Sequence, residues 1–188
     1  MSEAVAETGV RARTRRAILD AAVETLTRQP GASLGDIAAA ANVGRTTVHR
    51  YFPERADLID AISADALEKA ANATAHARLD EGPAVPARSR LCQEFFEFGD
   101  VFMLLFTMPD LLTREEWQEE TESDRMLMRL IERGHKEGTI DPDLPAVWVQ
   151  QLLWSLLYTA WEQIREYEMP KHDALSLCLR TLAKAISA

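Results

Sequence analysis

The sequence has few cysteines, the residues that form the disulfides of small secreted domains and bind metals such as zinc. It contains only two cysteines, Cys92 and Cys178, and neither has a partner at metal-ligand spacing. They therefore predict no disulfide framework and no zinc site. No apolar run approaches the roughly eighteen residues that cross a bilayer, and residues 1–10 lack the basic start and apolar stretch of a secretory signal. We expect a disordered tail over residues 1–10, a cytoplasmic chain and no membrane partner.

Histidine, the residue most often used in catalysis and metal binding, is also scarce. His76, His135 and His172 lie on separate segments, without metal spacing or a nearby nucleophile signature. The sequence accordingly predicts no catalytic residues, no metal and no cofactor. An all-helical enzyme is the least favoured alternative.

Charge is distributed unevenly along the 188 residues. The net charge is −9, yet residues 11–55 hold eight arginines against four acidic residues, a local charge of +4 that leaves −13 for the rest. A basic segment attached to an acidic body suits docking on DNA in one orientation, because phosphate repels the body. A hydrophobic content of 47% provides a sizeable core for one compact unit or two small domains.

The stretch from Ser33 to Phe52 reads as two short helices joined by a tight turn. Ser33 is placed to cap the first helix, which carries apolar residues at the three-and-four spacing of one buried stripe. Asn42 and Gly44 tolerate the left-handed backbone of a sharp turn. Pro53 ends the second helix, since it disfavours helical geometry at the preceding residue.

The second helix, from Arg45 to Phe52, separates an apolar face from a polar one. Val48 and Tyr51 fall on the apolar side, whereas the opposite side carries hydroxyl, imidazole and guanidinium groups that can bond base edges in a DNA major groove. A plain helical hairpin with a solvated polar face is the alternative. The predicted DNA contacts are Ser33, Arg45, Thr46, Thr47, His49, Arg50 and Arg55.

These residues carry a family resemblance. Arg15 to Ile62 resembles the N-terminal domain of the TetR family of transcriptional regulators, in which three helices hold a helix-turn-helix. The match is the order of Asp36-Ile37-Ala38, Ala41, Val43, Thr47-Val48, Arg50-Tyr51-Phe52-Pro53, Arg55 and Leu58. The sequence departs from the family where Asn42, Gly44, His49 and Arg55 replace the usual Gly, Ser, Tyr and Lys. His49 thus stands in place of a phenol that commonly contacts phosphate.

Apolar periodicity predicts further helices on both sides of this motif. One is expected from about Arg13 to Arg28, with arginines that can approach phosphates. Others are expected over about 54–77, 87–106, 113–136, 147–164 and 173–186, and Gly99-Asp100 can interrupt the second of these. The fold class is therefore all-α with about nine helices. Residues 11–55 form the helix-turn-helix DNA-binding domain, and residues 56–188 form a larger helical ligand-binding and dimerisation domain.

Large soft side chains repeat at helical spacing in this second domain. They are ordinary core or the wall of an apolar ligand cavity, and the sequence alone does not separate the two. The candidate ligand-binding residues are Phe95, Phe98, Phe102, Met103, Phe106, Met126, Trp154, Tyr158 and Trp161. The acidic run after Thr113 reads as a solvated face, and a less favoured interpretation gives Glu94, Glu97 or Glu120 the role of receiving a cationic ligand.

The helix over 147–164 has apolar stripes on two nearly opposite sides, so both sides must be covered. We assign its aromatic stripe to the cavity and its aliphatic stripe to a second copy of the chain, together with the helix over 173–186. Two helices from each of two chains would close a four-helix interface, which the TetR resemblance also implies. The candidate dimer residues are Val149, Leu153, Leu156, Ala160, Leu175, Leu179, Leu182 and Ile186.

Together these patterns predict a sequence-specific DNA-binding regulator. The expected protein is a homodimeric repressor that binds a pseudo-palindromic double-stranded DNA operator and is released by a small, largely apolar effector. In a two-fold dimer the two reading helices must lie about 34–36 Å apart, or a multiple of that, to enter successive major grooves. A helical small-molecule-binding protein that has lost specific DNA reading is the main alternative.

Overall fold

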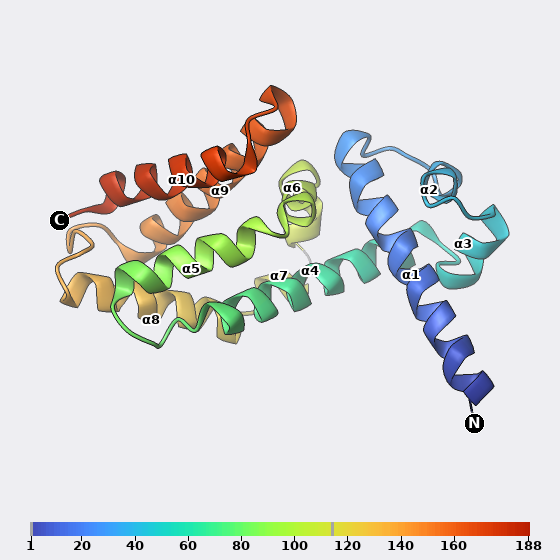
Figure 1. Ribbon diagram of the computed structural model, residues 1–188, viewed down its shortest axis with the longest axis horizontal. Helices are drawn as coiled ribbons and strands as arrows, with labels where there is room; N and C mark the ends of the chain where they lie inside the picture. The colour runs from blue at the N-terminus through green and yellow to red at the C-terminus, as the bar shows by residue number, and fades with distance from the viewer. Residues whose placement is uncertain (1, 114) are drawn as a thin grey trace.

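The computed structural model describes the backbone of residues 2–113 and 115–188, and the side chains within 9–109, 111–113 and 115–188. All regular structure in these residues is helical (Figure 1), as predicted. It comprises nine α-helices of seven residues or more, one four-residue helix and one 3-10 helix. No helix in the described part of the chain is long and apolar enough to cross a membrane.

Three helices form a small unit at one end of the molecule (Figure 1): α1 (Ser2–Arg28), α2 (Leu34–Ala40) and α3 (Arg45–Tyr51). We call this unit the reading head. Apolar side chains from all three helices are buried against one another and against the start of the next helix, because each short helix has only one apolar face to cover. The buried set includes Ile18, Leu19, Leu26, Ile37, Val48 and Phe52.

The first helix is longer than the sequence suggested. We expected a disordered tail over residues 1–10 and a helix from about Arg13, whereas α1 begins at Ser2. Apolar periodicity reveals only the part of a helix that has a buried face. The side chains of residues 10–13 are exposed, so the apolar stripe of α1 begins after them. The residues before position 8 are rich in alanine and glutamate, which are strong helix formers. The predicted start followed apolar periodicity alone and so missed this propensity.

A single long helix joins the reading head to the rest of the chain. α4 (Arg55–Ala77) has 23 residues and is therefore about 35 Å long. At its start Glu54 and Asp57 form a capping box, and at its end Arg78 adopts a left-handed backbone with φ of 47°. Figure 1 shows α4 leaving the reading head and running along the helical body.

The body consists of α5 (Ala84–Phe96), α6 (Gly99–Thr107), η1 (Pro109–Thr113), α7 (Glu115–Gln118), α8 (Glu122–Lys136), α9 (Ala146–Tyr167) and α10 (Lys171–Ile186). The break expected at Gly99-Asp100 occurs just before Gly99. The single helix expected over 113–136 is wrong. Thr121 and Asp124 form a capping box that starts α8 as a new helix, a signal that outweighs continuous apolar periodicity.

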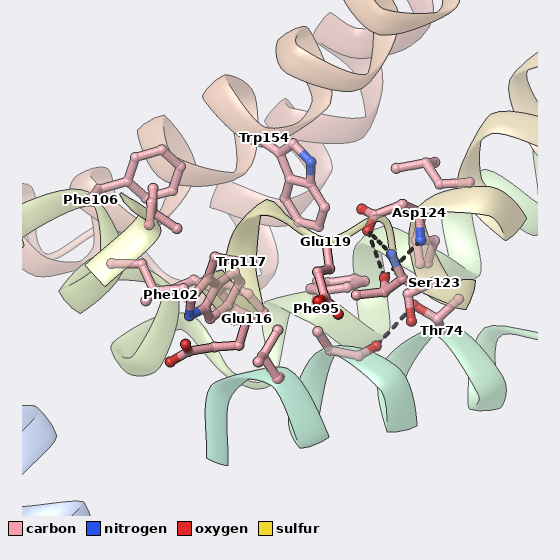
Figure 2. Close-up of a pocket in the computed structure, with 17 residues that line it drawn as sticks. Thr74, Phe95, Phe102, Phe106, Glu116, Trp117, Glu119, Ser123, Asp124 and Trp154 are labelled. Atoms are coloured by element: carbon pink, nitrogen blue, oxygen red, sulfur yellow. Dashed lines mark hydrogen bonds between the residues drawn. The ribbon is translucent and has the colours of Figure 1, made fainter. Parts of the chain in front are cut away.

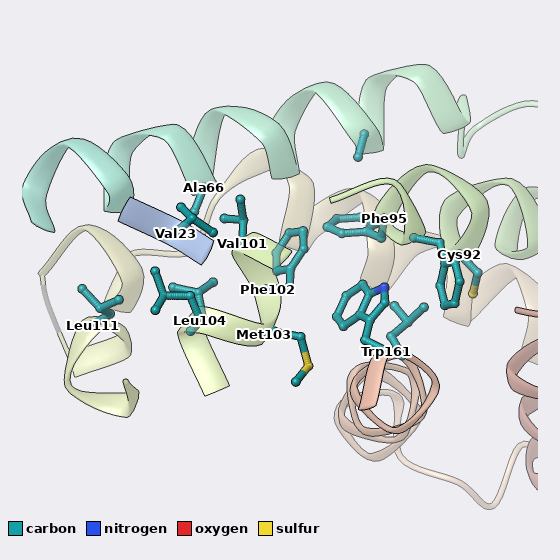
Figure 3. Close-up of a cluster of buried hydrophobic side chains, with 14 of the residues drawn as sticks. Val23, Ala66, Cys92, Phe95, Val101, Phe102, Met103, Leu104, Leu111 and Trp161 are labelled. Carbon is teal, nitrogen blue, oxygen red and sulfur yellow. The ribbon is translucent and has the colours of Figure 1, made fainter. Parts of the chain in front are cut away.

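Figure 3 shows buried hydrophobic side chains in the body, with the rings of Phe95, Phe102 and Trp161 among them. The rings of Phe102 and Trp161 lie nearly parallel, at 6° and 5.7 Å between centroids, and Phe95 meets Trp154 edge-on at 4.8 Å. Such offset and edge-to-face pairs hold rings in fixed relative positions. The aromatic packing therefore ties α5, α6 and α9 into one unit.

Both cysteines are buried and free. Burial raises the pKa of the Cys92 thiol to about 12 and that of Cys178 to about 11. A thiol that keeps its proton is a poor nucleophile, so both side chains act as small core residues.

Candidate functional site

Local interactions shape both the start of α2 and the turn that joins α2 to α3. The Ser33 hydroxyl accepts from the Asp36 backbone N–H at 3.2 Å and donates to the Asp36 carboxylate at 2.7 Å. These bonds hold the pKa of Asp36 below its ordinary value. Asn42 takes the left-handed backbone, with φ of 54°, whereas Gly44 at the start of α3 is ordinary, with φ of −70°. Only the asparagine therefore makes the sharp turn that we assigned to both residues.

The reading helix α3 presents its polar face to solvent. Val48 is fully buried and Phe52 is 2% exposed, so the apolar face predicted for this helix is confirmed. The Arg50 guanidinium lies 5.4 Å from the Tyr51 ring centroid and has no ion-pair partner among the described residues. The polar candidates Arg45, Thr46, His49 and Arg50 are exposed, and Thr47 is half-buried.

Besides Ser33, two more of the predicted DNA contacts are bonded to other parts of the chain. The Arg55 guanidinium donates to the carbonyl of Pro30 at 2.6 Å and to that of Ala32, so it fastens the loop before α2 to the start of α4. The His49 Nδ1 lies 3.2 Å from the Pro53 carbonyl. A proton on Nδ1 makes this bond and leaves Nε2 as an acceptor toward solvent.

Two arginines of α1 contact other parts of the chain. Arg15 stacks over Phe52 at 5.5 Å. Arg16 pairs with Asp20 on its own helix and with Asp65 on α4, which raises the pKa of the guanidinium. Arg16 therefore joins the reading head to α4, and its guanidinium is already paired and not free to bind phosphate.

A cavity of about 300 Å³ lies inside the body, walled by α4 to α9 (Figure 2). Four of the predicted ligand-binding residues line it: Phe95, Phe102, Phe106 and Trp154. The other lining residues are Leu67, Ala70, Thr74, Leu91, Leu105, Leu112, Glu116, Trp117, Glu119, Thr121, Ser123, Asp124 and Leu127. Aromatic rings with few converging polar groups are typical of a small-molecule site.

The remaining candidates for ligand binding lie elsewhere. Met103 and Trp161 line a second hollow between α1, α6 and α9, and Phe98 lies where α5 and α6 meet α1. Met126 and Tyr158 are half-buried and do not line the cavity. Helical periodicity placed all five on apolar faces but could not say which face adjoins empty space.

Three carboxylates reach the cavity that the sequence did not single out: Glu116, Glu119 and Asp124. Glu119 has no hydrogen-bond or ion-pair partner in the part of the chain that the structure describes. The carboxylates proposed from sequence are paired elsewhere: Glu94 lies 3.7 Å from His76, Glu97 2.9 Å from Lys171 and Glu120 3.6 Å from Arg125. The carboxylates that line the cavity and those that do not occur in similar acidic stretches of the sequence. Only the packing of the folded chain distinguishes them.

Known proteins resemble this chain over nearly its whole length. Residues 18–62 match the sequence model of bacterial regulatory proteins of the tetR family. Over 181 residues, the chain is 34% identical to the HTH-type transcriptional repressor LfrR of Mycolicibacterium smegmatis, covering 96% of this chain and 94% of that protein. The chain belongs to the TetR family. TetR-family regulators are a non-enzymatic class, so the expectation that the chain is not an enzyme is confirmed by its relatives.

Solved structures agree with this assignment. The crystal structure of LfrR from Mycobacterium smegmatis has a TM-score of 0.75 at 32% identity, covering 96% of this chain and 99% of that one. The same regulator in complex with proflavine has a TM-score of 0.74 at 33% identity, covering 95% and 99%. The ketosteroid regulator KstR2 of Mycobacterium tuberculosis, at 15% identity, TM-score 0.70 and coverage of 93% and 95%, shares the fold.

In this TetR-family chain, the stripe assigned to a second copy needs correction. Val149, Leu153, Ala160, Leu182 and Ile186 are at most 5% exposed within one chain. They pack between α9, α10 and the rest of the body and are not free to meet a partner. Periodicity showed two nearly opposite apolar stripes on α9. The side of α9 that faces the core includes residues of both stripes. Leu156, Leu175 and Leu179 are half-buried and stay candidates for the interface.

Proposed function

We propose that this TetR-family regulator is a homodimeric repressor that binds a pseudo-palindromic double-stranded DNA operator and is released by a ligand in the cavity. The observation that carries the proposal is the presence in one chain of an exposed reading helix and an aromatic cavity, joined by α4. The 34% identity to the repressor LfrR, over 96% of the chain, supports the proposal.

The exposed face of α3 supports major-groove binding. Arg50 and Arg45 can donate to guanine, and Thr46 and Thr47 can bond bases or touch a thymine methyl. Ser33 and Arg55 contribute indirectly, because the first caps α2 and the second fastens the loop before it. In a two-fold dimer these groups would read two half-sites about 34–36 Å apart or a multiple of that distance.

The chemistry of the cavity refines the expected effector. Proflavine, which LfrR binds, is a planar fused-ring diamine that is a cation at neutral pH. Phe95, Phe102 and Trp154 offer ring faces and edges for stacking, and Glu119 offers a carboxylate with no partner among the described residues. Cations are attracted both to aromatic faces and to carboxylates. We infer that the effector is a planar aromatic molecule, and that a positive charge strengthens its binding.

The outer face of α9 is the surface we assign to the second copy. Trp148 is 58% exposed, and Leu152, Ser155 and Thr159 continue from it at the three-and-four spacing of one helix stripe. Small side chains along such a stripe let two helices approach closely. The neighbouring stripe of α10 contains Leu175, Ser176, Leu179 and Ala183.

Selection of genomic DNA fragments by the purified protein tests the proposal, with Arg50→Ala beside it at matched salt. We expect one pseudo-palindromic sequence, recovered less well by the variant, since loss of a guanine contact costs about 1–3 kcal/mol. A uniform loss over all sequences with a smaller salt dependence would assign Arg50 to phosphate instead. Fragments no better than those of the variant would favour the alternative, a ligand-binding protein without a specific operator.

A further inference from the structure

We propose that a hydrogen-bonded relay centred on Ser63 is the contact through which a cationic ligand in the cavity acts on α4 and on the reading head. The Ser63 relay consists of the Trp117 indole N–H, which donates to the Ser63 hydroxyl at 2.8 Å, and that hydroxyl, which donates to the Glu116 carboxylate at 2.9 Å. The inference rests on the proposed function and names the residues that would couple its two sites.

Ser63 is unusual among its neighbours on α4. It is fully buried on the mostly apolar inner face of α4, where a hydroxyl costs free energy unless both its donor and its acceptor capacity are used. Here both are used, and both partners come from α7, a helix of four residues. Since so short a helix has little packing of its own, these two bonds are a main attachment of α7 to α4.

The two partners of Ser63 are also walls of the ligand cavity. Glu116 and Trp117 both line it, and Figure 2 shows them beside Phe102, with α4 running below. A ligand in the cavity therefore touches the same side chains that hold α7 on α4. Binding and attachment compete for the same groups.

Charge decides the competition at Glu116. A ligand cation adds the attraction of opposite charges to its hydrogen bond with the Glu116 carboxylate. The neutral Ser63 hydroxyl cannot supply that attraction, so the cation is the better partner. An uncharged molecule of the same shape can fill the aromatic part of the cavity but offers the carboxylate nothing to replace Ser63. The relay would thus open for cations and stay closed for neutral ligands.

The opposite side of α4 holds the reading head at the same level of the helix. Asp65 follows Ser63 by two residues, about 200° around the helix, and it pairs with Arg16 of α1 and with Lys69 at 3.0 Å. One turn of α4 is therefore fixed to the cavity wall on one side and to the head on the other. A shift of α4 when the relay opens is transmitted directly to α1.

DNA affinity measured with and without saturating proflavine tests this relay. For the wild type we expect proflavine to weaken binding by about 5- to 150-fold, the usual range of coupling between sites. Ser63→Ala opens the relay permanently, so its DNA affinity should already be reduced and proflavine should add little, while proflavine fluorescence still reports binding. Glu116→Gln keeps an oxygen for Ser63 but loses the charge, so proflavine should bind without releasing DNA.

Acridine at mildly alkaline pH, where it is uncharged and proflavine is a cation, should bind the wild type and release DNA far less. The matched control is Ser89→Ala on α5, which removes a hydroxyl bonded only to its own helix, at 3.1 Å from the Val85 carbonyl. It should respond to proflavine as the wild type does.

The outcomes separate the relay from the proposed function. A wild type whose operator binding ignores proflavine would overturn both. A coupled wild type, with Ser63→Ala and Glu116→Gln equally coupled, would overturn the relay alone and favour the packing of α1 on α6 as the route. Should Ser63→Ala fail to fold, Glu116→Gln and the comparison of acridine with proflavine still decide the matter.

Discussion

A single methyl group added at Gly99 should disturb the aromatic packing of the body. It is the first residue of α6, and a Cβ added there would lie 2.7 Å from Cδ1 and 2.8 Å from Nε1 of Trp161. Real Cβ contacts are essentially never under 3.0 Å. The indole must move if Gly99 becomes alanine.

The indole has little room to move. Trp161 is 4% exposed and stacks on Phe102 at 5.7 Å and on Phe96 at 6.0 Å. Overpacking of this kind costs about 1–3 kcal/mol, and the better helix propensity of alanine returns at most about 1 kcal/mol. For a chain of this size, each kcal/mol lowers the melting temperature by about 2–4 °C. Because Phe102 lines the cavity, proflavine affinity should fall as well.

Thermal unfolding followed by circular dichroism, with proflavine titration of the folded protein, measures both effects. Gly31→Ala is the matched control, since no atom lies within 4 Å of its added Cβ. Trp161→Phe should relieve the clash in the double variant, and it breaks no hydrogen bond because the indole nitrogen is buried without a partner. A Gly99→Ala protein as stable as the wild type would refute the claim that aromatic stacking fixes the indole.

Three further predictions concern the dimer, the effector and the link between head and body. Trp148→Glu should yield monomers in sedimentation, because it puts a charge on the outer face of α9; a dimer as stable as that of a Val85→Glu control would rule this face out. Glu119→Gln should weaken proflavine more than acridine in a fluorescence titration, and equal losses would show that this carboxylate does not meet the charge. Partial burial raises the pKa of Asp65, but hydrogen bonds from Arg16 and Lys69 outweigh it and hold the pKa below its ordinary value. Its pairing therefore stabilises the folded chain above the ordinary carboxyl pKa of about 3.9 and is lost as pH falls through the lower folded value. Asp65→Asn should accordingly be less stable than the wild type in denaturant at neutral pH, with a gap that closes in acid; a gap independent of pH would contradict the charge pairing.

Local signals predicted the reading head well. The Ser33 cap, the turn at Asn42 and the apolar side of α3 depend on neighbours a few residues away, so the sequence contains nearly all that determines them. The start of α1 was missed because the sequence of its first turns carries no apolar stripe. The roles of Arg55 and Arg16 came from distant contacts, with the loop at Pro30 and with Asp65.

The cavity was predicted in part. Four large aromatic residues were identified because bulky side chains at helical spacing must cluster somewhere. The carboxylates that reach the cavity were not, since Glu116 and Glu119 belong to the same acidic run as Glu120. Which of them points inward depends on the break before Thr121 and on where α7 lies against α4.

The sequence by itself therefore determined the family, the all-helical class and the chemistry of the reading helix, because caps, turns and short-range periodicity act within a few residues. Only the tertiary structure decided which side of α9 faces the core, which acids face the cavity and that Ser63 joins α4 to α7. These features are contacts between segments far apart in the chain: Ser63 and Trp117 are 54 residues apart, and Phe95 and Trp154 are further apart still. Apolar periodicity shows that one face of a helix must be buried, but it does not show which other segment buries it.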